Sequence, residues 1–177
     1  MLSLRSWRPQ DAATLHDIAA ATRDLALQTA GARLTTIDEC ESFIAERLPC
    51  TASVVNLAIA EDDVPVGNVG LSNIEYSHGT AWAYYWLAEG ARGRGLATRA
   101  LASIAQWAFT EQALHRLELG HRVNNPASCG VATRAGFATE GVEREKLRYG
   151  TERFDVERHA RLATDAAPQI EPIRVEA

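Results

Sequence analysis

Residues 86–98 read WLAEGARGRGLAT and join a β-prone aromatic run to the start of an amphipathic helix. In the run from Gly79 to Leu87, aromatic side chains alternate with others, so both faces carry large side chains and a central strand is predicted. From Leu96 to Glu111 apolar residues recur at helical spacing. A glycine-rich loop therefore connects a central strand directly to the N-terminus of a helix.

This loop favours an anionic ligand. The first turn of a helix leaves several N–H groups unpaired and carries a partial positive charge. Gly93 and Gly95 have no side chains that would hold a phosphate away, and Arg92 and Arg94 add positive charge. The loop predicts a phosphate or pyrophosphate site; the alternative is that the glycines only make a turn.

Two common nucleotide motifs fit the loop poorly. In the dinucleotide fingerprint G-x-G-x-x-G the third glycine is replaced here by Thr98. That fingerprint also follows the first strand of a parallel unit, whereas an antiparallel meander is predicted here. No Gly-Lys-Ser or Gly-Lys-Thr follows the loop, so the P-loop pattern is absent too.

Outward from the loop, the pattern predicts a single α+β domain of three layers over residues 1–162, with 163–177 as a loose tail. Asp11 is expected to cap the first predicted helix, and Thr36, with Glu39 at capping-box spacing, the second, which Pro49 stops. Asp62-Asp63 forms the turn of a hairpin. The strands are predicted at 2–7, 53–61, 64–72, 79–87, 116–122, 137–142, 146–149 and 151–162. The helices are predicted at 9–21, 36–48, 96–111 and 125–135, and 25–34 is ambiguous.

Composition narrows the classes of partner. The chain has 177 residues, 46% of them hydrophobic, a net charge of -5 and a pI near 5.5, which disfavours nucleic acid as the main partner. No apolar run reaches about 18 residues, so we expect a cytoplasmic protein that does not span a membrane. The five histidines and three cysteines form no compact ligand motif, so the sequence predicts no metal.

Arg92-x-x-Gly95-x-Ala97 resembles the acetyl-CoA signature of the GCN5-related N-acetyltransferase (GNAT) superfamily. Further segments resemble its branch of ribosomal-protein N-terminal acetyltransferases, RimJ and RimL. These segments are residues 4–12, Tyr85-Trp86-Leu87, Asn125-Pro126-Ala127-Ser128 and Ala135-Gly136-Phe137. The resemblance implies a mixed, mostly antiparallel central sheet, flanked by helices on both faces and splayed where acetyl-CoA binds.

The resemblance also implies which residues bind acetyl-CoA as cosubstrate. Backbone amides of the loop would hold the pyrophosphate, and an open strand edge would pair with the pantetheine arm. Asn125 would hydrogen-bond the pantetheine, and Ser128 would lie near the thioester sulfur. The expected cofactor-binding residues are Trp86, Leu87, Ala88, Arg92, Gly93, Arg94, Gly95, Leu96, Ala97, Asn125 and Ser128.

Proton transfer has two candidate residues. Many relatives use a tyrosine four residues before the glycine of Gly136-Phe137, but Ala132 stands there, so the resemblance assigns the catalytic acid to Ser128. Glu118 is the first candidate base because it interrupts an apolar strand; a polar strand face is the alternative interpretation. Weaker candidate bases are Tyr84, Tyr85 and His121, and Trp82 stands where relatives often have a glutamate.

The predicted function is acetyl-CoA-dependent N-acetylation of a primary amine, either a protein N-terminus or a small molecule. A site without a strong general base suits an α-amine with pKa near 8 better than a lysine side chain with pKa near 10.4, because more of the α-amine is neutral at pH 7. The alternatives are a non-catalytic coenzyme A sensor and an enzyme that uses another acyl-CoA such as succinyl-CoA. Relatives are often dimeric, so a homodimer is an open expectation.

Overall fold

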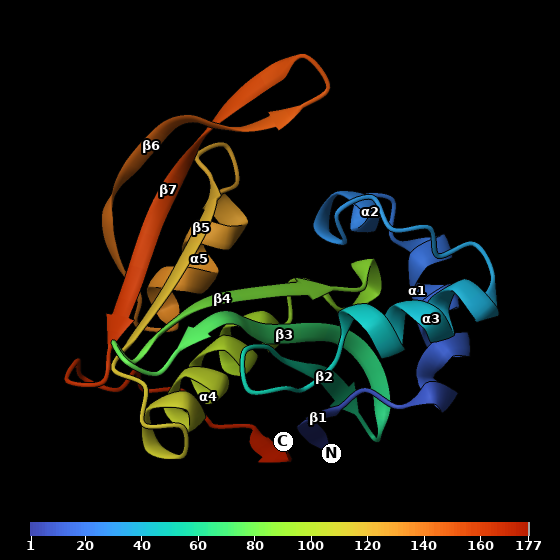
Figure 1. Cartoon of the computed structure of the whole chain (residues 1–177), viewed down its shortest axis with the longest axis horizontal. Helices are drawn as coiled ribbons and strands as arrows, with labels where there is room; N and C mark the ends of the chain where they lie inside the picture. Colours follow the sequence, from blue (N-terminus) through green and yellow to red (C-terminus); the bar gives the residue numbers. More distant parts are fainter. Residues whose placement is uncertain (177) are drawn as a thin grey trace.

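In the computed structural model, which describes residues 1–176, eight strands form one sheet in the order β6-β7-β5-β4-β3-β2-β1-β8 (Figure 1). The strands are β1 Leu2–Ser6, β2 Val55–Glu61, β3 Val64–Glu75, β4 Thr80–Leu87, β5 Arg116–Arg122, β6 Ala138–Tyr149, β7 Glu152–Leu162 and β8 Arg174–Glu176. The helices are α1 Ala12–Ala21, α2 Leu25–Gln28, α3 Ile37–Arg47, α4 Leu96–Thr110 and α5 Pro126–Arg134, with short 3-10 turns η1 Pro9–Asp11 and η2 Glu89–Ala91. The predicted mixed, mostly antiparallel sheet with helices is confirmed.

Strand β4 lies in the middle of the sheet, as its pattern predicts. Ala83 and Leu87 join the core beneath α4, whereas Trp86 packs in a second core with α1 and α3. Both faces of β4 are therefore covered by helices. This arrangement explains why its side chains are large in both alternating sets.

The sheet opens between β4 and β5. These strands pair in parallel over three residue pairs only, Thr80 with Arg116 to Trp82 with Glu118. Beyond Trp82, β5 follows its antiparallel partner β7 and β4 follows β3, so the two strands separate (Figure 1). The splay predicted from the family resemblance is therefore present in the fold.

Local signals account for most element boundaries. The Thr36 side chain caps α3 by accepting a hydrogen bond from the Glu39 amide at 3.1 Å, as the sequence predicts. Asp62 and Asp63 form the β2–β3 turn with φ of 48° and 68°.

Of the helices in the described part of the chain, none is long and apolar enough to cross a membrane.

Two segments differ from the sequence-based prediction. The two short strands predicted at 137–142 and 146–149 are one strand, β6, interrupted by register shifts against β7. The end of the predicted loose tail forms β8, which pairs in parallel with β1, and Ile173 is buried. A three-residue edge strand has no hydrophobic periodicity to reveal it, because its pairing depends on the partner strand.

A buried ion-pair network joins the N-terminal strand to η1. The Arg5 guanidinium donates to both carboxylate oxygens of Asp11 at 2.8 and 2.9 Å, and to Asp63 at 2.6 Å. The Arg5 and Asp11 side chains are 3% and 7% exposed. Asp11 was expected to cap the first helix, but its carboxylate accepts instead from Arg5 and from the Arg8 amide at 2.9 Å.

Replacing Asp11 should destabilise the fold strongly, because it leaves a buried guanidinium partly unpaired. We expect Asp11→Ala to lower the free energy of unfolding by about 3 kcal/mol. Asp17→Ala, at a carboxylate 85% exposed on α1, should change it by less than about 0.5 kcal/mol. Urea denaturation measures both, and equal losses would contradict a stabilising role for the Arg5 network.

Candidate functional site

The glycine loop presents free backbone amides at the N-terminus of α4. Gly93 and Gly95 have φ of 74° and 76°, a left-handed conformation that glycine adopts without strain. The space above both Cα atoms is open to 4 Å. Within residues 1–176, the amides of Gly93, Arg94 and Gly95 donate to no other group. Together with the first turn of α4 they provide the hydrogen-bond donors that the predicted anion site requires.

The two loop arginines are engaged in ion pairs. Arg92 contacts Asp24 at 2.7 Å and donates to the Leu87 carbonyl at 3.2 and 3.3 Å. Arg94 makes a two-pronged pair with Glu61 at 2.6 and 2.8 Å. The Arg92 guanidinium accordingly lowers the pKa of the Asp24 carboxyl. In this arrangement the positive character of the loop comes from its backbone dipoles more than from its side chains.

Strand β4 offers an unpaired edge to the splay. The Ala88 amide donates to the Val66 carbonyl of β3 at 2.9 Å. Main-chain groups alternate in direction along a strand, so the amide of Trp86 points to β3, and those of Tyr85 and Leu87 point toward the gap. The Leu87 amide therefore faces the splay, and the Trp86 amide does not.

Helix α5 borders the other side of the gap. Asn125 is its N-cap, and its side-chain oxygen accepts from the Ser128 amide at 3.1 Å. Ser128 is half-buried in the first turn. The Tyr85 hydroxyl crosses from β4 and donates to the Ser128 carbonyl at 3.4 Å, and burial raises the pKa of this phenol. The structure thus brings Tyr85, Asn125 and Ser128 together beside the open edge.

Glu118 lies at the last paired position before the splay, opposite Trp82. Its carboxylate accepts from Arg116 at 2.7 Å and from Arg158 at 2.5 Å. Arg158 also stacks over the Trp82 ring, 4.7 Å from its centroid. The Glu118 carboxylate is therefore paired with two guanidinium groups, and its role as the base stays a prediction.

The other residues considered for proton transfer lie apart from the open edge. Ala132 is a fully buried residue of α5, and its methyl side chain cannot transfer a proton. The Tyr84 hydroxyl donates to Asn56 at 2.8 Å on the opposite face of β4. Neither position can supply the missing phenol.

His121 forms part of a cluster that the sequence analysis did not anticipate. Its Nε2 lies 3.0 Å from Nε2 of His159, and Glu157 and Cys129 complete the group. Glu157 and His159 are two residues apart on one strand and so share a face, which is the signal in the sequence. His121 and Cys129 come from other elements, so no compact motif reveals the cluster.

The arrangement fits coenzyme A. The open space over Gly93 and Gly95 leaves room for a pyrophosphate beside unpaired amides. The β4 edge offers Tyr85 and Leu87 amides to an extended arm that itself contains amide groups. These two features lie on consecutive segments of chain, as a ligand with a phosphate at one end and an extended arm requires.

Comparison with known proteins identifies the family. A family model described as an acetyltransferase (GNAT) domain matches residues 1–138. Probable N-acetyltransferase YjcK of Bacillus subtilis (strain 168) is 36% identical over 90 residues, 50% of each chain. The ribosomal-protein-serine acetyltransferase of Escherichia coli (strain K12) is 32% identical over 104 residues, 59% of this chain and 58% of that one.

The chain thus matches 50% and 58% of the length of these two relatives. A solved structure of RimL, a ribosomal L7/L12 α-N-protein acetyltransferase in complex with coenzyme A, is 22% identical. Its TM-score is 0.79, over 91% of this chain and 93% of that one. This likeness supports the fold, and the family model covers most of the chain. The chain therefore belongs to the GNAT family of acetyltransferase domains, as the signature around Arg92 and Gly95 predicts.

Proposed function

We propose that this protein is an N-acetyltransferase that uses acetyl-CoA and acetylates a primary amine. The observation that carries the proposal is the open β4 edge that runs directly into the glycine loop at the N-terminus of α4. Acetyl-CoA supplies the activated acetyl thioester. The chain binds it, orients it and moves protons.

Binding is divided between two sets of groups. The amides of Gly93, Arg94 and Gly95, with the first turn of α4, hold the pyrophosphate. The Tyr85 and Leu87 main-chain groups pair with the arm, and the Leu87 amide lies at the end nearer the loop. Asn125 keeps its side-chain oxygen on the Ser128 amide, so only its NH₂ group is available to the ligand.

Ser128 and Tyr85 are placed to donate the proton that the departing thiolate needs. Tyr85 reaches Ser128 from across the gap, and its raised pKa keeps the phenol protonated at neutral pH. A protonated hydroxyl is a donor and not a base, which suits the role of catalytic acid. Ser128 stays the residue nearest the sulfur, and Tyr85 joins it as a second donor.

The acceptor amine should be one that is partly neutral at pH 7. The Glu118 carboxylate is occupied by two guanidinium groups, so the site offers no free strong base there. An α-amine with pKa near 8 is about one-tenth neutral at pH 7, whereas a lysine near 10.4 is neutral at well under one part in a thousand. A protein α-amine, the kind of group that RimL acetylates, fits this requirement, as does a small amine of low pKa.

Release of free coenzyme A thiol from acetyl-CoA tests the proposal. The acceptors are peptides with different N-terminal residues, lysine with a blocked α-amine, and small amines including a polyamine, against an amine-free control. We expect release with an α-amine or a low-pKa amine and little with blocked lysine. Binding of coenzyme A without release across the panel would favour a sensor, and release only from succinyl-CoA would change the donor.

The glycine loop can be tested with a matched pair of variants. Gly95 and Gly150, the latter in the β6–β7 turn, both have positive φ, 76° and 59°, and open space above Cα. Alanine should strain either backbone by about 1–2 kcal/mol. Only Gly95→Ala places a methyl group over the free amides, so calorimetry should show at least a tenfold loss of coenzyme A affinity there. Equal affinities in the two variants would contradict the loop as the phosphate site.

Variants at the α5 end separate proton donation from structure. We expect Ser128→Ala to lower kcat about 100-fold with little change in KM, and Tyr85→Phe to act in the same direction. Glu118→Gln should lower kcat less than tenfold, because its carboxylate is already paired.

The pH profile of the wild type tests Tyr85. Burial raises the pKa of this phenol above its ordinary value of 10.0, so deprotonation of Tyr85 should cause no loss of activity below pH 10.0. A Tyr85→Phe variant with unchanged kcat would remove Tyr85 from the mechanism.

A further inference from the structure

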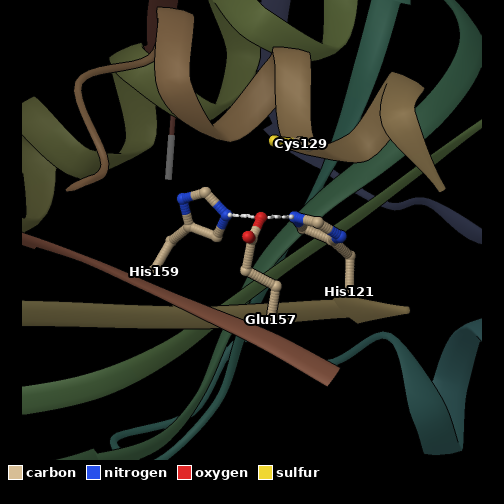
Figure 2. A group of neighbouring side chains, drawn as sticks. All are labelled: His121, Cys129, Glu157 and His159. Atoms are coloured by element: carbon tan, nitrogen blue, oxygen red, sulfur yellow. Dashed lines mark hydrogen bonds and ion pairs between the residues drawn. The ribbon is translucent and has the colours of Figure 1, made fainter. Parts of the chain in front are cut away.

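Four potential metal ligands meet under helix α5. His121 stands on β5 and Glu157 and His159 stand on β7, where His121 pairs with Glu157 and His159 with Leu119. Side chains at these directly opposed and alternate positions project to one face of the sheet. Cys129 comes from α5, which covers that face, and Figure 2 shows the Glu157 carboxylate between the two imidazole rings.

The ligand atoms are close together and largely shielded from water. The His159 Nε2 lies 2.9 Å from the Glu157 Oε2 and 3.0 Å from the His121 Nε2, and the third distance of this triangle, His121 Nε2 to Glu157 Oε2, is 3.3 Å. The Cys129 sulfur completes a set whose members all lie within 4.8 Å of one another. The His159 and His121 side chains are 0% and 6% exposed, and Glu157 is 25% exposed.

The backbone fixes which nitrogen of each ring faces the cluster as an acceptor. Nδ1 of His121 lies 3.0 Å from the Arg122 carbonyl, and Nδ1 of His159 lies 3.3 Å from the Phe137 carbonyl. A carbonyl oxygen only accepts, so each Nδ1 carries the proton in the neutral ring. Both Nε2 atoms then direct lone pairs at each other and at a carboxylate, an arrangement that requires a cation between them.

A divalent ion can bind all four side chains of the cluster, which a proton cannot do. A proton on one Nε2 can form hydrogen bonds to the other Nε2 and to the Glu157 carboxylate, but it does not involve the Cys129 sulfur. In tetrahedral zinc sites, ligand atoms at about 2.0–2.3 Å from the ion are separated by roughly 3.3–3.6 Å. The observed triangle lies within about 0.4 Å of that spacing.

We propose that His121, Cys129, Glu157 and His159 form a tetrahedral zinc site. Two imidazoles, a thiolate and a carboxylate are a ligand set that zinc accepts, and each ring already has the carbonyl partner on its second nitrogen that metal-bound histidines have. Four protein ligands leave no open position, so the ion has a structural role. It would fasten α5, which carries Asn125 and Ser128, to strands β5 and β7.

Cobalt titration of the full chain tests the site, with Co²⁺ as the probe. After dialysis against a chelator, wild type should bind one equivalent and show both the visible bands of tetrahedral Co²⁺ and a thiolate-to-cobalt charge-transfer band. Zn²⁺ should displace it. At Zn²⁺ 100-fold above Kd, the melting temperature should rise by roughly 5–10 °C. No tetrahedral spectrum and no shift in melting would overturn the proposal and leave a proton as the shared cation.

Single substitutions identify the ligands. Cys129→Ser should remove the charge-transfer band and weaken binding at least 100-fold, and Glu157→Gln should weaken binding while it keeps the band. Cys50→Ser is the matched control, because Cys50 is an exposed free thiol outside the cluster. It should bind as wild type does. If Cys129→Ser retained the band, or Cys50→Ser lost it, the assignment would be wrong. These readouts are independent of acetyl transfer.

Discussion

The unpaired edge of β4 beyond Trp82 is the constraint on which the rest of the structure depends. Backbone N–H and C=O groups in the middle of a sheet need partners, and β5 provides them for only three residue pairs. The Arg92 guanidinium covers the Leu87 carbonyl. The Tyr85 and Leu87 amides are left facing the gap, so a ligand with amides of its own completes the sheet.

The splay itself costs few hydrogen bonds, because each strand is fully paired on its other side. β4 follows β3 from Leu87 back to Trp82, and β5 follows β7 along all seven of its residues. The strands diverge as parts of two separately paired halves. The splay therefore separates two halves of one sheet, and β4 and β5 each keep a hydrogen-bonded partner strand on the other side.

The sequence predicts what depends on neighbours in the chain. Alternating side chains in β4, helical spacing in α4, the Thr36 cap and the Asp62-Asp63 turn are local patterns, and each predicted element is found. The free amides at Gly93 and Gly95 follow from glycines placed just before a helix. The family signature adds the position of the splay, which residue pattern alone does not show.

Contacts between distant segments could not be predicted in this way. The sequence does not reveal that Arg92 and Arg94 pair with Asp24 and Glu61, which lie 68 and 33 residues away. The cluster of His121, Cys129, Glu157 and His159 could not be predicted for the same reason, because His121 and His159 are 38 residues apart in the sequence. The spacing of Glu157 and His159 shows only that they share a face of one strand. The pairing of β5 with β7 is what brings His121 to the same face.

The long-range pairs also show how the two halves of the site are held. The glycine loop is tied to the N-terminal half through Asp24 and Glu61, and the Arg5 network fastens the first strand and η1 within that same half. Helix α5 and the histidine cluster belong to the other half, on β5 and β7. The Tyr85 hydroxyl is a contact that crosses between them, at the Ser128 carbonyl. Each half is braced within itself, so a ligand that enters the splay meets one wall from each half. The Tyr85 hydrogen bond, the stacking of Arg158 on Trp82 and the packing of α5 on α4 together set the position of Ser128 relative to the loop.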